Sequence, residues 1–104
     1  MANVDYVVAT GAPLTEVIAK ARLATGAWEV GENRLHTSDD RVELRVYPSG
    51  SEVVVEIYLA GTLAERRDLS QRIYHYLVAN TDCNVALDSD DADRTITSRT
   101  VTRV

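Results

Sequence analysis

The densest group of chemically capable side chains is a run of carboxylates at residues 88–93. Asp88, Asp90, Asp91 and Asp93 place four acidic side chains within six residues. Ca²⁺ takes about six to eight oxygen ligands, so such a run invites a calcium site. An EF-hand loop, however, needs glycine at its sixth position and glutamate at its twelfth, where this chain has Asp93 and Arg99. We therefore expect no metal here and interpret the run as an acidic surface loop.

A second acidic pair, Asp39 and Asp40, falls in another predicted loop. Together the two loops could form one acidic surface that recognises lysine and arginine side chains of a partner. Residues 38–40 and 89–91 share the sequence Ser-Asp-Asp and could instead supply a carboxylate pair for acid–base catalysis. Because Ser-Asp clusters are typical of turns between strands, we favour turns and expect no catalytic residue in either loop.

The histidines and the cysteine lack the spacing of a metal or nucleophile site. His36 and His75 have neither a second histidine nor a cysteine at zinc-ligand spacing. Cys83 is the single cysteine, which excludes an internal disulfide and favours a buried structural role. Residues 10–13, between a predicted strand and helix, contain one glycine and no lysine, unlike a phosphate-binding loop. We expect no cofactor.

The basic and aromatic residues suggest packing more than nucleic-acid binding. The main basic cluster, Arg66, Arg67 and Arg72, is explained by ion pairs with Glu65 and Asp68 on the same predicted helix. The chain has 16 acidic and 11 basic side chains, a net charge of −5, which disfavours binding to phosphate backbones. The single tryptophan, at position 28, is predicted to lie in the core, with an interface anchor as the alternative.

Length and composition indicate one folded domain over residues 1–104. The chain is 45% hydrophobic and has no apolar run near the roughly 20 residues of a membrane span. Residues 1–10 lack the basic region and long apolar core of a signal peptide, so we expect a soluble, cytoplasmic protein. Ten of the eleven basic side chains are arginine, which fits a GC-rich bacterial genome.

The hydrophobic periodicity predicts an α+β fold. We expect a mainly antiparallel sheet of about five to six strands with two helices on one face, in the order β-α-β-β-β-α-β-β. The first helix should run from about Pro13 to Thr25, and the second should follow a capping box at residues 62–65 and end near Asn80. The predicted strands span residues 4–9, 28–37 (irregular), 41–47, 52–59, 84–88 and 94–104.

The strongest hairpin joins residues 41–47 and 52–59 through a turn at residues 48–51. Alternate residues of both strands are apolar and should face the core. The other face is mixed, and with the helices on one side it is free to face solvent or a partner. This mixed face comprises Glu43, Arg45, Tyr47, Val54, Glu56 and Tyr58.

These observations predict a small, acidic, non-enzymatic domain that binds another protein. Its specific form would be an immunity or inhibitor protein whose acidic surface covers the basic cleft of a toxin or nuclease. The alternatives are a homo-oligomer formed through the Tyr face or the last strand, a small enzyme with a site assembled from distant loops, and a nucleic-acid module on the sheet face. The predicted partner-binding residues are Asp39, Asp40, Asp88, Asp90, Asp91, Asp93, Tyr47, Tyr58 and Arg45.

Overall fold

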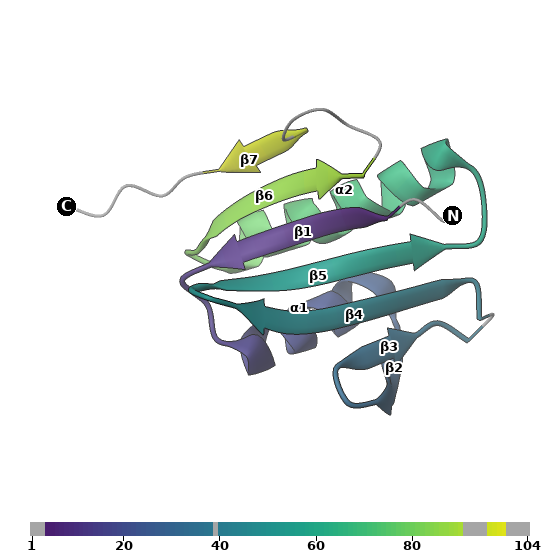
Figure 1. Cartoon of the computed structure of the whole chain (residues 1–104), viewed down its shortest axis with the longest axis horizontal. Helices are drawn as coiled ribbons and strands as arrows, with labels where there is room; N and C mark the ends of the chain where they lie inside the picture. Colours follow the sequence, from purple (N-terminus) through teal and green to yellow (C-terminus); the bar gives the residue numbers. More distant parts are fainter. Residues whose placement is uncertain (1–3, 39, 91–95, 100–104) are drawn as a thin grey trace.

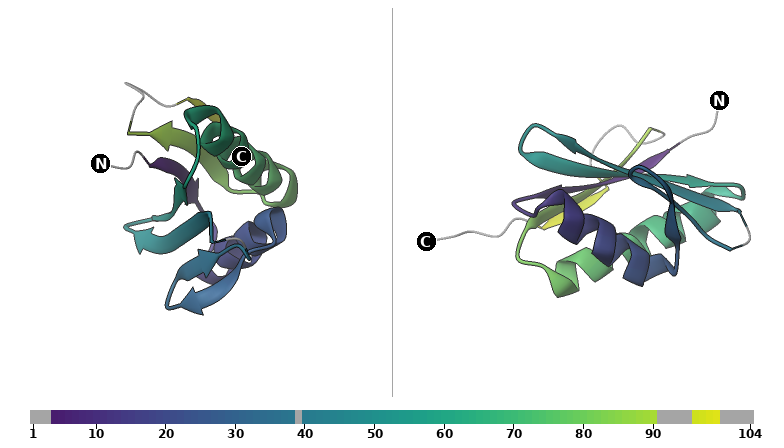
Figure 2. Two further views of the ribbon diagram at one scale, coloured as in Figure 1. Left: turned by 90° about the vertical axis from the view of Figure 1, so that its right-hand side faces the viewer. Right: turned by 90° about the horizontal axis from the view of Figure 1, so that it is seen from below.

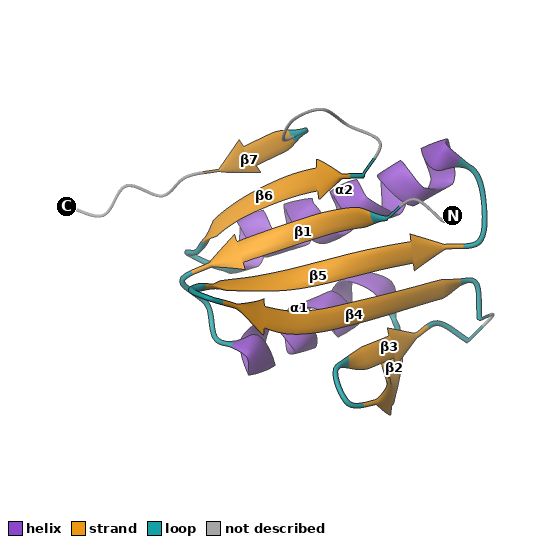
Figure 3. Ribbon diagram, viewed as in Figure 1, coloured by secondary structure: helices purple, strands orange, loops and turns teal. Residues whose placement is uncertain are grey.

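The computed structural model describes residues 4–38, 40–90 and 96–99 and confirms the α+β fold. In chain order the elements are β1 (Asp5–Thr10), α1 (Leu14–Thr25), β2 (Trp28–Gly31), β3 (Arg34–His36), β4 (Val42–Ser49), β5 (Glu52–Leu59), α2 (Leu63–Asn80), β6 (Asn84–Ser89) and β7 (Thr97–Arg99). The seven strands that are described form one antiparallel sheet in the order β2-β3-β4-β5-β1-β6-β7 (Figures 1 and 3).

The central part of the sheet has the split βαβ, or ferredoxin-like, arrangement. If the short strands β2 and β3 are left aside, the chain order is β-α-β-β-α-β, made up of β1, α1, β4, β5, α2 and β6. In the sheet, β1 lies between β5 and β6. The short strands β2 and β3 extend one edge of this unit, and β7 extends the other. Both helices pack on the same face of the sheet, as the sequence predicted, so no helix in the described part of the chain covers the opposite face (Figure 2).

Local sequence signals define the helix ends. α1 follows Pro13 and ends at Gly26, whose φ of +74° is left-handed and whose N–H donates to the carbonyl of Arg22 at 2.8 Å. α2 begins with the predicted capping box. Thr62 Oγ1 accepts from the Glu65 N–H at 3.1 Å, and Glu65 Oε1 accepts from the Thr62 N–H at 3.0 Å.

The predicted hairpin is confirmed as β4 and β5, but its turn is shorter than the predicted residues 48–51, because Pro48 and Ser49 still pair with β5. Its turn consists of Gly50 and Ser51, and Gly50 has the positive φ, +61°, that a two-residue hairpin turn requires. The alternate apolar residues of both strands are buried against the helices. The core between sheet and helices includes Val7, Val17, Ala21, Leu35, Leu44, Val46, Val55, Ile57, Ile73, Leu77, Val85 and Leu87, and also Cys83, as expected.

Three local expectations were wrong. Residues 28–37 form two strands, because Gly31 pairs with Arg34 and the interrupting residues make a tight turn with Asn33 at φ +58°. Trp28 is not a core residue: it lies on β2 and is 48% exposed. β6 continues to Ser89, so Asp88, which was assigned both to the end of the predicted strand and to the start of the acidic loop, belongs to the strand.

The final strand is described only at residues 97–99, and residues 94, 95 and 100–104 of the prediction lie outside the described residues. The guanidinium of Arg99 donates to the carbonyls of Val78, Thr81 and Cys83 at 2.5, 2.9 and 2.7 Å. These bonds tie β7 to the C-terminal end of α2, where the helix dipole also favours a cation. In the described part of the chain, neither helix has the length and apolar character needed to cross a bilayer.

Candidate functional site

The candidate site is the sheet face opposite the helices, which we call the open face. Strand register places side chains from four strands in one row across it. Arg45 of β4 pairs with Glu56 of β5, Glu56 pairs with Tyr6 of β1, and Tyr6 pairs with Asp88 of β6. Directly paired residues share a face and have Cβ atoms about 4.5–5.5 Å apart. The row therefore brings charged and aromatic groups from distant parts of the chain into contact range.

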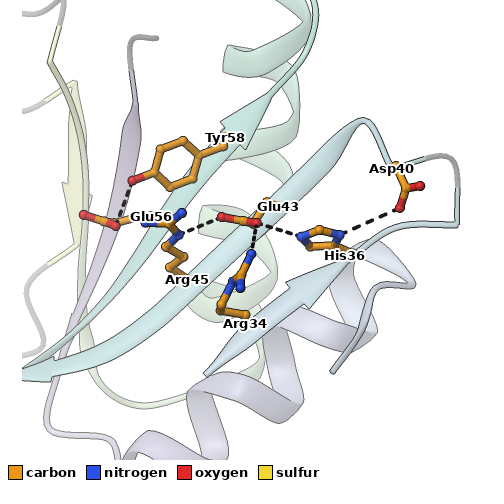
Figure 4. A network of polar contacts seen from close by, with 7 residues as sticks. All are labelled: Arg34, His36, Asp40, Glu43, Arg45, Glu56 and Tyr58. Carbon is orange, nitrogen blue, oxygen red and sulfur yellow. Dashed lines mark hydrogen bonds and ion pairs between the residues drawn. The ribbon is translucent and has the colours of Figure 1, made fainter. Parts of the chain in front are cut away.

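One side of the open face contains a carboxylate with three nitrogen donors, which we call the Glu43 network (Figure 4). Arg34 Nη2 donates to Glu43 Oε1 at 2.8 Å, and Arg45 Nε donates to Glu43 Oε2 at 2.6 Å. His36 Nε2 lies 2.7 Å from Oε1. The hydrogen bond from Arg34, with those from His36 and Arg45, outweighs the opposing effect of burial and lowers the pKa of Glu43 to about 2.

The network extends from the sheet to the β3–β4 connection through His36. Its Nδ1 lies 3.8 Å from Oδ1 of Asp40, which is exposed and has a left-handed φ of +58°. His36 thus stands between two carboxylates (Figure 4). Shallow depressions flank the network, one of about 360 Å³ beside His36, Glu43 and Tyr58, and one of about 450 Å³ beside Arg34 and Arg45.

Glu56, at the middle of the open face, accepts hydrogen bonds from two phenols. Tyr47 donates to Oε2 at 3.0 Å and Tyr58 donates to Oε1 at 3.1 Å. Arg45 stacks on the ring of Tyr58, with its guanidinium carbon 5.0 Å from the ring centroid. Burial, and then the bond to Glu56, raise the pKa of Tyr47 to about 12, and the same causes raise the pKa of Tyr58.

Tyr6 forms a second meeting point of an aromatic ring and carboxylates. Its hydroxyl donates to Asp90, and its strand neighbours on either side are Glu56 and Asp88. Burial, followed by the bond to Asp90, raises the pKa of Tyr6 to about 12. Beside this ring an apolar centre formed by Val8, Val54 and Ala86 lies across the same three strands, and Val54 is only 9% exposed although no helix covers it.

The open face is divided by charge. The β3–β4 part, which we call the basic half, contains Arg34, His36 and Arg45 around Glu43. The β5–β1–β6 part, which we call the acidic half, contains Glu52, Glu56, Asp88 and Asp90. None of the three strands of the acidic half contains a lysine, arginine or histidine.

A second carboxylate cluster lies on the helix side of the sheet and does not belong to the open face. Asp5 is fully buried. Arg66 Nε donates to its Oδ1 at 3.0 Å, Arg67 Nε donates to its Oδ2 at 3.3 Å, and Ser70 Oγ donates to Oδ2 at 2.7 Å. We call this the Asp5 cluster; it ties α2 to β1.

The Asp5 cluster and a salt bridge from Arg41 revise the expectation for the arginines of α2. Glu65, expected to pair with them, is bound by Arg41 Nη2 at 3.0 Å from the connection before β4. The arginines of the cluster are pinned against β1 instead of lying on a solvated helix face. A long-range partner thus replaces the intrahelical pairing that the spacing suggested.

The structure brings some of the predicted site residues together and separates others. Arg45, Tyr47 and Tyr58 lie on the open face around Glu56, and Asp88 and Asp90 join them through Tyr6. Asp40, in the connection between β3 and β4, lies at the same end of the sheet as Asp90, but β5 and β1 come between β4 and β6, so three strand spacings or at least about 14 Å separate them. Asp39, Asp91 and Asp93 lie outside the described residues.

Sequence reasoning placed Glu43 and Glu56 on the mixed face but missed their central position. It also missed Arg34, His36 and Tyr6 as members of the site. The alternation of polar and apolar residues in β3 and β1 was a usable signal for the side of the sheet. Their neighbours depend on strand order, which alternation does not encode.

Within the described residues, no group of three or more His, Cys, Asp or Glu side chains is arranged to hold a metal ion. The described side chains of the open face carry hydrogen-bonding groups, ion pairs and aromatic rings. Searches against protein-family models, curated proteins and solved structures find no match to this chain.

Proposed function

We propose that this chain is a protein-binding domain, that the open face is its interface, and that its partner is a basic protein. The observation that supports this most directly is the asymmetry of the sheet. Helices cover one face, whereas the other presents three tyrosines and two arginines around an apolar centre. Tyrosine and arginine are enriched among the residues that dominate the energy of protein interfaces.

The ionisation properties of the face favour binding over catalysis. An efficient general acid or base has a pKa near the working pH. Here the arginines and histidine around Glu43 lower its pKa to about 2, while burial raises the pKa values of Tyr6 and Tyr47 to about 12. Near neutral pH these groups keep a fixed charge state, which suits recognition of a charged partner.

The charge division favours a basic partner over a second copy of this chain. In the basic half, the single negative charge of Glu43 offsets one of its two arginine charges, so about one positive charge remains there against the four carboxylates of the acidic half. The acidic half has four carboxylates and no cationic residue on its strands. A toxin or nuclease with a basic cleft is the partner class that we propose, in keeping with the immunity or inhibitor role expected from the sequence.

A site-specific crosslinking experiment tests the interface. A photoreactive phenylalanine analogue replaces Tyr47 on the open face or, as a matched control, Tyr76, a partly buried tyrosine of α2. We expect a crosslink to a different, basic protein from position 47 and none from position 76. A crosslink to a second copy would support the homo-oligomer instead, and equal crosslinking at both positions would contradict the proposal.

Once the crosslink has identified the partner, the partner is purified on its own for an affinity measurement. Ala86→Arg adds bulk and charge to the centre of the open face, and Ala79→Arg makes the same change on the exposed surface of α2. We expect Ala86→Arg to weaken binding by about thirtyfold or more, as for a change at an interface hot spot. Ala79→Arg should leave the affinity unchanged. Equal losses for the two variants would remove the open face from the interface.

A further inference from the structure

We propose that the ring of Tyr6 is the docking position for one arginine side chain of the partner, which stacks on the ring and pairs with Glu56 and Asp88. We call this position the Tyr6 site. The inference rests on the proposed function, because it specifies the chemistry of the partner at one point of the open face.

Strand pairing surrounds the Tyr6 ring with carboxylates. Glu56 of β5 and Asp88 of β6 are its directly paired neighbours on either side. Asp90 accepts the hydrogen bond of its hydroxyl, which fixes the outer end of the ring. A cation above the ring would therefore lie within reach of two carboxylates and of the electron-rich aromatic face at once.

The neighbouring strands already contain the same combination with an arginine in place. Tyr58 pairs in register with Glu43, as Tyr6 pairs with Glu56. The guanidinium of Arg45 lies 5.0 Å from the Tyr58 ring centroid, and its Nε bonds Glu43 Oε2 at 2.6 Å. This sheet thus shows how a tyrosine flanked by a carboxylate binds a guanidinium.

The charge distribution explains why the partner supplies the cation at Tyr6. Glu56 accepts its two hydrogen bonds from neutral phenols, and the nearby Arg45 is committed to Glu43. The strands that form the Tyr6 site contain no basic residue. A guanidinium fits better than an ammonium because its planar fork can stack on the ring while donating to carboxylates on both sides.

An NMR titration with a model ligand tests the site without knowledge of the partner. The probe is an acetylated and amidated tri-arginine peptide, and the control is the same peptide with citrulline, which has arginine's shape without its charge. We expect the arginine peptide to shift amide resonances of β1, β5 and β6 in a salt-dependent manner, and the citrulline peptide to cause no such shifts. Shifts centred on another surface would overturn the assignment.

Matched variants separate the contributions of charge and ring. Asp88→Asn should weaken peptide binding by about two- to fivefold, whereas Asp82→Asn, in the exposed connection before β6, should not change it. Tyr6→Leu should weaken binding by about two- to fivefold, and Tyr6→Phe, which keeps the ring, should retain it. A circular dichroism spectrum checks the fold of each variant, and Asp88→Asn still decides the question if Tyr6→Leu does not fold. Equal effects of Asp88→Asn and Asp82→Asn would overturn the site.

The same variants distinguish failure of this inference from failure of the proposed function. If Ala86→Arg abolishes partner binding while Asp88→Asn and Tyr6→Leu leave it unchanged, the Tyr6 site is wrong and the interface stands. If Ala86→Arg has no effect on partner binding, the proposed interface is wrong, whatever the peptide does.

Discussion

The Asp5 cluster and the Glu43 network both bind a carboxylate with arginines, and they lie on opposite faces of one sheet. Each holds a carboxylate with two arginines and one further donor, Ser70 in the first and His36 in the second. The difference is burial. Asp5 is 0% exposed, whereas the side chain of Glu43 is 19% exposed and its two arginines are each 49% exposed.

This comparison shows that burial, more than residue type, decides what an ion cluster contributes. Removing one partner from a buried cluster leaves an uncompensated charge, which is strongly destabilising. An exposed cluster is hydrated and contributes little to stability, so its side chains are available for contacts with another molecule. The Asp5 cluster therefore holds α2 on the sheet, and the Glu43 network forms part of the surface that we propose as an interface.

The largest effect should follow from Asp5→Asn, which removes the buried negative charge but keeps the shape of the side chain. We expect a loss of about 3–5 kcal/mol in the free energy of unfolding, because the facing arginines lose their counter-charge in a water-poor environment. Urea denaturation of the wild type and the variant measures this loss.

Combining Asp5→Asn with Arg66→Met should recover part of the lost stability, because it removes the more buried of the two arginines that lose their ion pair with Asp5. A loss for Asp5→Asn no larger than that for Glu43→Gln would contradict the distinction between the two regions.

A smaller and pH-dependent effect should follow from Glu43→Gln, with a loss of about 1 kcal/mol at neutral pH. The pKa of Glu43 is lowered in the fold from 4.5 to about 2, so its ionised form stabilises the native state. That contribution is fully present above about pH 4.5 and disappears as the pH falls towards 2. Denaturation curves of both proteins over this range should therefore converge at acid pH. A constant difference would show that Glu43 acts through its shape alone.

The smallest effect should follow from Tyr47→Phe, which removes one hydrogen bond to a partly exposed carboxylate and costs about 0.5 kcal/mol. The fold raises the pKa of Tyr47 from 10.0 to about 12, so its protonated form is the stabilising one. The stabilisation is present below pH 10 and is lost as the pH rises towards 12. The difference between ultraviolet titrations of the wild type and Tyr47→Phe should show Tyr47 ionising well above pH 10; ionisation at the ordinary value would contradict its burial and its bond to Glu56.

The parts of the fold with short-range signals could be predicted from the sequence. Alternation over residues 42–47 and 52–59 identified the β4–β5 hairpin and its two faces, and the Thr62–Glu65 capping box located the start of α2. The β2–β3 hairpin was missed because its strands are short and a register shift interrupts the alternation between Glu29 and Gly31.

The long-range contacts could not be predicted, because spacing along the chain does not reveal which strands are neighbours. Asp5 falls at a core-facing position of β1, yet its two arginine partners are 61 and 62 residues away. A carboxylate in an apolar alternation was the available signal that such a partner must exist. The Tyr6 part of the candidate site was missed in the same way, since Tyr6 meets Glu56 and Asp88 only through strand pairing.

The central position of β1 has a consequence for the order in which the protein folds. Residues 5–10 pair with residues 52–57 on one side and with residues 84–89 on the other. Synthesis proceeds from the N-terminus, and contacts between distant residues require the closure of long loops. β1, which precedes its two partner strands in the sequence, is therefore fully paired only after residue 89 has been made. Asp5 likewise gains its partners on α2 only after residue 70 has been made.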